Sequence, residues 1–337
     1  MNIKLPEVNE LTDEQIKILD EIGAVSISGG AGTGKTVLSI WKHILNWEKR
    51  NIKSFLITYT HSLTRYFELS IKDESLEASQ HIQNKNQFKH KKNIDMLIID
   101  EAQDINIDTH EAFKDEYTSV SYGADDKQIL YPEEKSTEEE LNSLYKNKDF
   151  TLSQNFRNSY EILNFIKHVF PSSQISDQMI NYSKENFKTN NKPLLVYSNV
   201  QDELDSYLLE VIRNDSSKRV AILVPTVKMF NEYKDFLSSS KMNFSSYDNE
   251  DKGSIRYEEI KNIHLTIFKS SKGLEFDIVI IPEVDNFNYW KNKDSNSTIN
   301  KNDYYVGMTR AREKLILLSN QKDLFDINSN LYEIENI

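Results

Sequence analysis

The feature that most constrains this chain is the stretch from Gly29 to Thr36, which reads Gly-Gly-Ala-Gly-Thr-Gly-Lys-Thr. A short apolar run ends at Ser28, and apolar residues with helical spacing begin at Val37. A G-x-x-x-x-G-K-T pattern between a strand and a helix is typical of a phosphate-binding loop, because backbone N–H groups can close around an anion there. The alternative, a glycine turn that merely joins the two elements, is disfavoured by the Lys-Thr pair at this spacing. We therefore expect nucleotide phosphates to bind at Gly29, Gly30, Ala31, Gly32, Thr33, Gly34, Lys35 and Thr36.

A second motif begins at Met96 and reads Met-Leu-Ile-Ile-Asp-Glu-Ala-Gln-Asp. Four consecutive apolar residues suit a central parallel strand, and the two carboxylates follow at the end where ligands bind in open α/β sheets. We expect Asp100 to hold Mg²⁺ together with the Thr36 hydroxyl, Glu101 to polarise the attacking water, and Lys35 to reach the β- and γ-phosphates. An acidic turn after a buried strand is the alternative, and the upstream phosphate loop makes it less favoured.

Strand-like runs recur in the second half of the chain, at residues 194–197, 220–224, 263–268, 278–281 and 315–318. Helical patterns fall between several of them, which is typical of a parallel, doubly wound sheet. A length of 337 residues has room for about two ordinary domains. We therefore predict two α/β domains, at residues 1–150 and 151–337.

Composition excludes several classes of protein. The chain has no cysteine, which excludes a disulfide framework, thiol catalysis and Cys-ligated zinc. No apolar run approaches the ~20 residues of a membrane span, and the N-terminus lacks the apolar core of a signal peptide. We expect a cytoplasmic protein with no membrane partner. The net charge of −12 argues against a general nucleic-acid coat protein, although a binding channel needs only a few well-placed Lys and Arg residues.

With these motifs in order, the chain resembles the UvrD/Rep-like branch of superfamily 1 helicases over nearly its whole length, from Gln15 to Arg312. The resemblance implies two tandem RecA-like P-loop NTPase domains, each a mostly parallel sheet flanked by helices, with the ATP cleft between them. Family members usually carry large insertions before the D-E-x-x motif and before the K-G-L-E-F motif. The corresponding intervals are short here, so we expect a minimal two-domain core without the accessory subdomains.

Several roles follow from the resemblance alone. The Leu-Thr-Asp-Glu-Gln run that ends at Gln15 looks like the adenine-reading glutamine motif. The Asp-Asp-Lys-Gln run that ends at Gln128 resembles the D-x-x-Q motif, whose glutamine senses the γ-phosphate, although Ala124 precedes it where glycine is common. The Leu-Ser-Gln-Asn-Phe-Arg run resembles L-x-x-N-Y-R, which implies that Phe156 stacks on the adenine and Arg157 reaches the γ-phosphate.

Two further motifs complete the implied nucleotide site. Residues 272–276 reproduce K-G-L-E-F, which assigns Gly273 and Glu275 to the nucleotide, with Glu275 at the ribose. Residues 305–314 are similar to Y-V-A-L-T-R-A-K-E-K, which makes Arg310 a second arginine finger. Phosphoryl transfer needs positive charge around the transferring group, and the expected charges come from both domains, so both must close on ATP. If each domain also binds a nucleic-acid strand, repeated closure and opening would move the protein along it.

The sequence supports the candidate nucleic-acid contacts less strongly than the nucleotide site. The Thr-Tyr-Thr-His run contains Thr58, Tyr59 and Thr60 and is similar to the T-F-T-N contact motif. Lys269 stands where the family usually has a strand-contacting histidine, and a lysine there can bind phosphate. Tyr131 is a candidate base-stacking platform, and an aromatic packed between domains is an equally good interpretation.

The predicted function is Mg²⁺- and ATP-dependent translocation on nucleic acid, or limited unwinding of it, with single-stranded DNA as the expected track and RNA left open. Because the accessory subdomains are missing, we expect a protein partner such as a nuclease or another effector. One hypothesis places such a complex in repair or in antiviral defence. The alternative is an ATP-driven conformational switch that regulates a partner protein without translocating.

Overall fold

The computed structural model describes residues 5–59, 61–89, 91–129, 135–247, 260–285 and 299–337. The chain divides into two compact units, one ending at Ser153 and the other beginning at Gln154. Two residues of the predicted nucleic-acid surface, Thr60 and Tyr131, lie outside the described residues. Within the described ranges, no helix is long and apolar enough to cross a membrane.

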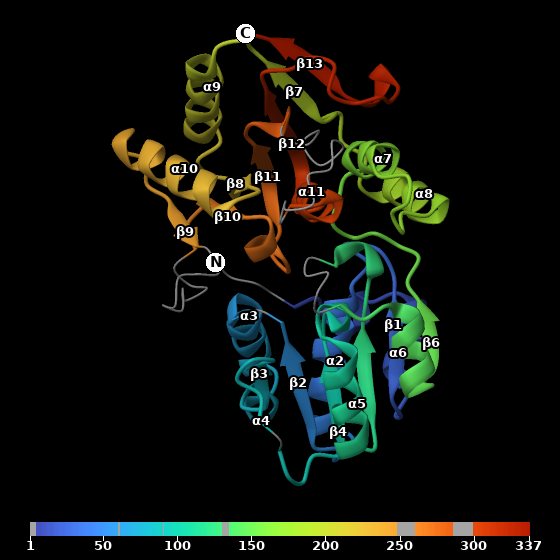
Figure 1. Ribbon diagram of the computed structural model, residues 1–337. Helices are drawn as coiled ribbons and strands as arrows, with labels where there is room; N and C mark the ends of the chain where they lie inside the picture. Colours follow the sequence, from blue (N-terminus) through green and yellow to red (C-terminus); the bar gives the residue numbers. More distant parts are fainter. Residues whose placement is uncertain (1–4, 60, 90, 130–134, 248–259, 286–298) are drawn as a thin grey trace. The chain divides into compact units, whose positions relative to one another are not determined.

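The first unit is built on a six-stranded sheet with the order β3-β2-β4-β5-β1-β6, and every neighbouring pair is parallel (Figure 1). Its strands are β1 (Val25–Ser28), β2 (Ser54–Thr58), β3 (Ile82–Asn84), β4 (Met96–Ile99), β5 (Val120–Gly123) and β6 (Lys148–Thr151). Its helices are α1 (Asp13–Asp20), α2 (Lys35–Glu48), α3 (His61–Lys72), α4 (Leu76–Ser79), α5 (Ile107–Glu116) and α6 (Glu138–Tyr145), with short 3₁₀ turns at Val8–Glu10, Ala102–Asp104 and Asp126–Gln128.

Helices cover both faces of this sheet, which explains the continuous apolar run in β4. Successive strand residues point to opposite faces. Ile98 accordingly packs in one core with Leu38 of α2, while Leu97 and Ile99 pack in another with Phe113 of α5. A strand buried on both sides has no solvent face that would favour polar residues.

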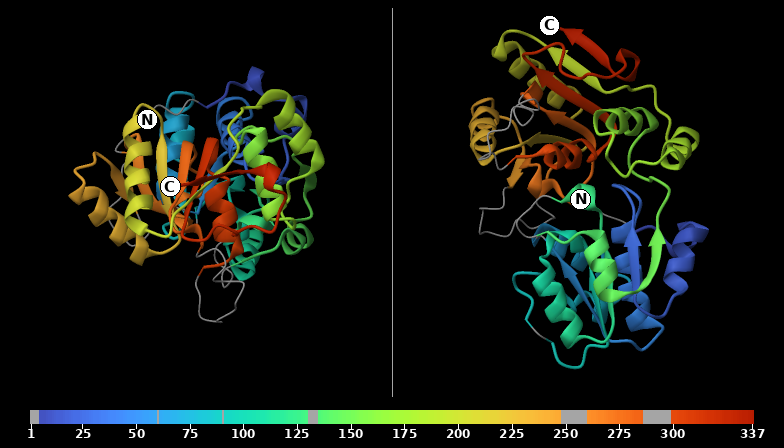
Figure 2. Two further views of the ribbon diagram at one scale, coloured as in Figure 1. Left: turned by 90° about the horizontal axis from the view of Figure 1, so that it is seen from above. Right: turned by 45° about the vertical axis from the view of Figure 1, so that its right-hand side comes forward.

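The second unit contains a seven-stranded parallel sheet with the order β13-β7-β12-β11-β8-β10-β9. Its strands are β7 (Leu194–Tyr197), β8 (Val220–Val224), β9 (Ser245–Tyr247), β10 (Ile263–Ile267), β11 (Phe276–Ile281), β12 (Ala311–Ser319) and β13 (Glu333–Asn336). Its helices are α7 (Tyr160–Val169), α8 (Asp177–Asn186), α9 (Gln201–Asn214), α10 (Val227–Ser239) and α11 (Lys301–Met308), with 3₁₀ turns at Lys269–Ser271 and Ser329–Leu331. The strand β13 forms an edge beside β7, where the chain ends (Figures 1 and 2).

The prediction of two α/β units with parallel sheets is confirmed, and all five strands expected in the second half are present. The sequence did not predict β3, β6, β9 or β13. These strands lie at sheet edges, and they are short. The residues of β6 are mostly exposed and those of β13 are all exposed, so neither strand carries an apolar run.

Candidate functional site

The predicted phosphate loop connects β1 to α2 and has a backbone that requires glycine. Gly29, Gly32 and Gly34 have positive φ angles of 143°, 74° and 95°. Gly34 is the residue that caps the N-terminus of α2, and a Cβ atom there would lie 2.6 Å from the Gln15 Nε2 atom. The loop therefore leaves its backbone N–H groups close to the positive end of a 14-residue helix, as anion binding requires.

Lys35 is buried and lies over this loop. Its ammonium donates hydrogen bonds to the carbonyl oxygens of Gly29 and Gly30, at 2.5 and 3.1 Å. The same Nζ atom is 4.0 Å from the Asp125 Oδ2 atom, at the end of β5. The structure thus places the lysine charge inside the loop predicted to bind phosphate.

Thr36 and Asp100 lie together, as the two predicted metal ligands should. The Thr36 hydroxyl donates to the Asp100 Oδ2 atom at 3.0 Å, and Ser39 Oγ is 3.5 Å from Oδ1. Neighbouring oxygen ligands of an octahedral Mg²⁺ ion, bound at roughly 2.1 Å each, are about 3 Å apart. The hydroxyl and carboxylate therefore fit a magnesium ion as adjacent ligands. The described residues contain no group of three or more His, Cys, Asp or Glu able to hold a metal, and nucleotide-bound Mg²⁺ needs only one or two carboxylates.

Glu101 follows Asp100 in a left-handed conformation, with φ at 57°, and is buried. The Gln103 amide donates to its Oε2 atom at 2.7 Å, and the Gln103 Oε1 atom accepts from the Asp125 backbone N–H at 3.2 Å. Gln103 is fully buried and was assigned no role from the sequence. It orients Glu101 by joining the end of β4 to the end of the neighbouring β5.

Gln128 reaches the same place from the turn after β5. Its Nε2 atom donates to the Asp125 Oδ2 atom at 2.7 Å, on the carboxylate that faces Lys35. Since β5 lies between β1 and β4 and all three are parallel, their carboxyl ends meet at one edge of the sheet (Figure 1). Asp125 is the aspartate of the run that resembles D-x-x-Q and received no role of its own, yet it contacts Lys35, Gln103 and Gln128.

Gln15 contacts the phosphate loop from the first turn of α1. Its Oε1 atom accepts from the Thr12 backbone N–H at 3.1 Å, and its Nε2 atom donates to the Thr33 carbonyl at 3.4 Å. The first contact is half of a capping box, which satisfies helix N–H groups that have no partner within the helix. The side-chain amide of Gln15, the predicted adenine-reading residue, therefore lies beside the loop, and both its oxygen and its nitrogen make a hydrogen bond.

In the second unit, Arg157 is paired with Glu275. The Arg157 Nε atom lies 3.3 Å from the Glu275 Oε2 atom, and Arg312 Nη1 donates to the Oε1 atom of the same carboxylate at 2.9 Å. Burial acts to raise the pKa of Glu275, but Arg157 and Arg312 outweigh it and hold that pKa below its usual range. Phe156 is half-buried, with its ring centroid 5.3 Å from that of Tyr182.

Arg310 is buried, and its guanidinium faces its own unit. It donates to the Val306 carbonyl at 2.9 Å, to the Thr309 hydroxyl at 3.2 Å and to the Leu274 carbonyl at 3.4 Å. Arg310 directly precedes β12 as Glu275 precedes β11, and Gly273 turns the chain before them with φ at 83°. Glu275 and Arg310 therefore lie at the amino ends of their strands, whereas Asp100 and Asp125 of the first unit follow the carboxyl ends of β4 and β5.

A pair of buried asparagines joins the Arg157 loop to the Arg310 turn. The Asn158 Nδ2 atom donates to the carbonyls of Thr309 and Ala311, at 3.1 and 2.6 Å. The Asn155 Oδ1 atom accepts from the backbone N–H of Arg157 and of Asn158, at 3.0 and 2.8 Å. Neither asparagine received a role from the sequence, although Asn155 stands in the run that resembles L-x-x-N-Y-R.

The candidate nucleic-acid residues differ in exposure. Thr58 is buried, with its hydroxyl 2.6 Å from that of Thr64. Tyr59 is half-buried, and the Lys85 ammonium lies 4.4 Å from the centre of its ring. Lys269 is also half-buried, in the 3₁₀ turn after β10. The described contact motif thus presents an aromatic ring beside a cation, the pair of groups that binds bases and phosphates.

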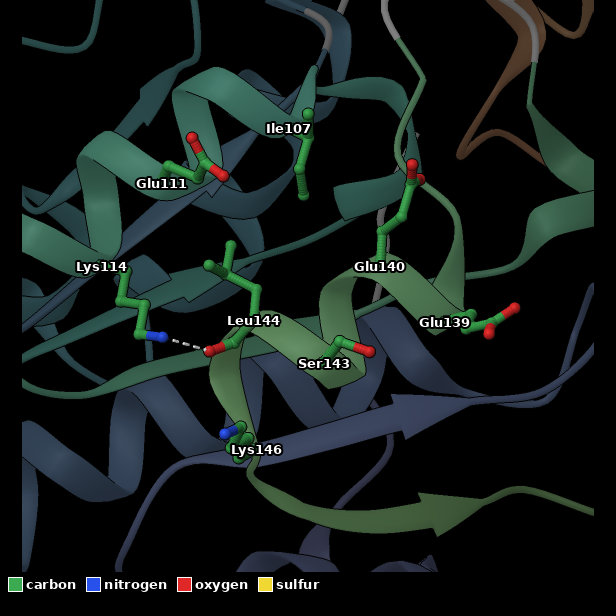
Figure 3. A pocket seen from close by; sticks show the side chains of 8 residues that line it. All are labelled: Ile107, Glu111, Lys114, Glu139, Glu140, Ser143, Leu144 and Lys146. Atoms are coloured by element: carbon green, nitrogen blue, oxygen red, sulfur yellow. Dashed lines mark hydrogen bonds between the residues drawn. The ribbon is translucent and has the colours of Figure 1, made fainter.

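An open groove of about 450 Å³ lies elsewhere in the first unit, between α5 and α6 (Figure 3). The Lys114 ammonium closes one side by donating to the Leu144 carbonyl at 2.6 Å. Its lining contains none of the predicted site residues. The lining residues are Ile107, Glu111, Lys114, Glu139, Glu140, Ser143, Leu144 and Lys146.

Two parallel sheets, the first with a glycine loop of the phosphate-binding pattern beside an acidic strand end, are typical of a nucleotide-binding protein of RecA-like fold. The family model of the UvrD-like helicase C-terminal domain matches residues 40–322, and the chain belongs to that family. The resemblance that the motifs indicated is confirmed. The match begins within α2, after the phosphate loop. No curated protein matches the sequence.

Solved structures are similar to this chain at low sequence identity. The Saccharomyces cerevisiae protein Dbp5, solved bound to RNA and ADP BeF3, is similar with a TM-score of 0.61 and 12% identity, over 96% of this chain and 89% of that one. The C-terminal domain of a possible DNA helicase from Lactobacillus plantarum WCFS1 has a TM-score of 0.37 and 18% identity, over 53% of this chain and 98% of that one. Arterivirus nonstructural protein 10, a helicase, has a TM-score of 0.46 and 14% identity, over 95% of this chain and 64% of that one.

Proposed function

We propose that this helicase-type protein hydrolyses ATP with Mg²⁺ and uses the energy to move along single-stranded DNA or to unwind short duplexes. One observation carries the proposal: Lys35, Thr36, Asp100 and Glu101 meet at the carboxyl edge of one sheet. Phosphoryl transfer needs little covalent chemistry from the protein. A cation, metal-binding oxygens and a carboxylate that orients water are the kinds of group that this reaction requires.

The residues of the first unit have separate tasks in this proposal. Lys35 binds the β- and γ-phosphates, and Thr36 with Asp100 would hold Mg²⁺, which when bound neutralises charge on the phosphate oxygens. Glu101 accepts a hydrogen bond from the attacking water, and Gln103 keeps its carboxylate oriented through the 2.7 Å contact. The cost of a left-handed non-glycine residue, ~1–3 kcal/mol, supports a functional reason for the position of Glu101.

The residues of the second unit complete the site in the same proposal. Arg157 and Arg310 supply positive charge to the γ-phosphate, Phe156 stacks on the adenine, and Glu275 binds the ribose beside Gly273. Because Arg310 now donates to three groups of its own unit, its engagement requires the exchange of at least one of those hydrogen bonds. Such an exchange would couple nucleotide contact to a local rearrangement of the turn before β12.

For the track, family membership supports nucleic acid, and the half-buried Tyr59 with Lys85 beside it is the described contact best suited to a strand. The yeast relative of the same fold was solved with RNA, so RNA is tested beside DNA. A nuclease or other effector remains the proposed protein partner, with repair or antiviral defence as the proposed setting. ATP-driven switching without translocation is the competing outcome of the same assay.

The test is the steady-state ATPase rate of the full chain with and without single-stranded DNA or RNA, at two salt concentrations. We expect stimulation by DNA that weakens as salt rises, because phosphate contacts release counterions. Lys35→Ala should abolish turnover, while Lys17→Ala, on the exposed face of α1, should leave it unchanged. An ATPase rate that changes with neither DNA nor RNA would favour a conformational switch without translocation. ATP hydrolysis that persists in Lys35→Ala would refute the proposed nucleotide site.

A further inference from the structure

Glu275 is bound by two arginines that differ in how firmly the fold holds them. Arg312 belongs to β12, which pairs with β11 through the register Phe276 to Ala311. Glu275 directly precedes Phe276 and Arg312 directly follows Ala311, so both residues lie next to one paired position of β11 and β12. Arg157, in contrast, lies in an irregular segment before α7. The sheet fixes Arg312 against Glu275, whereas Arg157 approaches from a loop.

The contact geometry shows the same difference. The Arg312 hydrogen bond to Oε1 is 2.9 Å, while the Arg157 contact with Oε2 is a single one at 3.3 Å. The nearby Arg219 guanidinium is occupied by Asp277, to which it donates two hydrogen bonds of 3.2 and 2.6 Å. Of the two arginines on Glu275, Arg157 has the longer bond and the less regular backbone. It is therefore the one that can leave.

The free-energy cost of releasing Arg157 depends on whether another cation stays bound to Glu275. A half-buried carboxylate that loses its only cation is left with an unpaired charge, which is costly, whereas one that keeps a second cation is not. Arg312 remains on the other oxygen when Arg157 moves. Without Arg312, the attraction between Glu275 and Arg157 would rise, and Arg157 would be held away from any other anion.

We propose that Arg312 is a positioning residue for ATP hydrolysis: it neutralises and holds Glu275 so that Arg157 can exchange this carboxylate for the γ-phosphate. This inference rests on the proposed function, since it assigns a new residue to the same site. Because this role needs only a positive charge at the Glu275 Oε1 atom, a lysine at position 312 should also serve.

The test is a double-mutant cycle on ATPase kinetics of the full chain. Arg312→Ala should lower kcat about tenfold with little change in KM for ATP, a coupling typical of residues in contact. Arg312→Lys should retain most of the rate. In a Glu275→Gln background, where the amide no longer holds Arg157, removing Arg312 should change kcat less than about twofold. Arg213→Ala, an exposed arginine on α9, is the matched control and should equal the wild type.

The outcomes separate the two proposals. A wild-type chain without ATPase activity refutes the proposed function itself. An active wild type whose Arg312→Ala variant keeps full kcat overturns the positioning role, as does an equal loss of kcat with and without Glu275, which would indicate a merely structural arginine. If Arg312→Ala fails to fold, Arg312→Gln keeps much of the stem and removes the charge, and the same comparison with Glu275→Gln decides.

Discussion

Asn158→Ala should destabilise the second unit, because this side chain joins two segments far apart in the sequence. Asn158 is fully buried and donates to the Thr309 and Ala311 carbonyls, at 3.1 and 2.6 Å. Its Oδ1 atom also accepts from Asn155 Nδ2 at 3.1 Å. Truncation to alanine removes all three hydrogen bonds and leaves two carbonyls without this donor.

The magnitude follows from those three bonds. Each is worth ~1 kcal/mol net, so the loss should be about 3 kcal/mol in the free energy of unfolding. Typical domains are stable by ~5–15 kcal/mol, so this change is large but leaves a folded protein. We also expect lower ATPase activity, since the Arg157 loop and the Arg310 turn lose their connection.

Hydrogen–deuterium exchange in a urea series, read peptide by peptide, measures this free energy for each unit. Peptides of α7 and β12 should lose ~3 kcal/mol, with α2 as the internal reference. Asn214→Ala, at the exposed end of α9, is the control and should stay within roughly 0.5 kcal/mol. Asn158→Asp keeps the side-chain size and removes both donors. Near-wild-type stability of that variant would refute the hydrogen-bond reasoning.

Three further predictions concern the first unit. Gly34→Ala should weaken ATP binding roughly tenfold or more, as titration calorimetry would show, because φ is 95° and the new Cβ would lie 2.6 Å from the Gln15 amide. Glu101→Gln should bind ATP normally yet hydrolyse it roughly 100-fold more slowly, and a normal single-turnover rate would remove its role. Burial lowers the pKa of His43 and of His110 to about 4, so the unfolded chain takes up protons between pH 6.5 and 4 that the folded chain does not. The free energy of unfolding should therefore fall across that window, and urea midpoints should fall less in His110→Gln than in the wild type.

Local chemistry made part of the site predictable. The phosphate loop needs only residues adjacent in sequence, since strand, glycines and helix start follow one another. The position of Asp100 at a strand end also follows locally, from an apolar run that stops at a carboxylate. Edge strands such as β6 escaped prediction, because mostly exposed polar residues have no periodic apolar pattern.

The tertiary structure decided which distant residues meet. The amino-acid sequence by itself determined the glycine loop between β1 and α2, the acidic strand end and the presence of two parallel α/β units. The insertion of β5 between β1 and β4, which brings Asp125 to Lys35, depends on long-range strand pairing. The same holds for Gln103 on the Asp125 backbone N–H and for Arg312 on Glu275. Periodicity reports which face of an element is buried, whereas the partner across that face is selected by the packing of the whole unit.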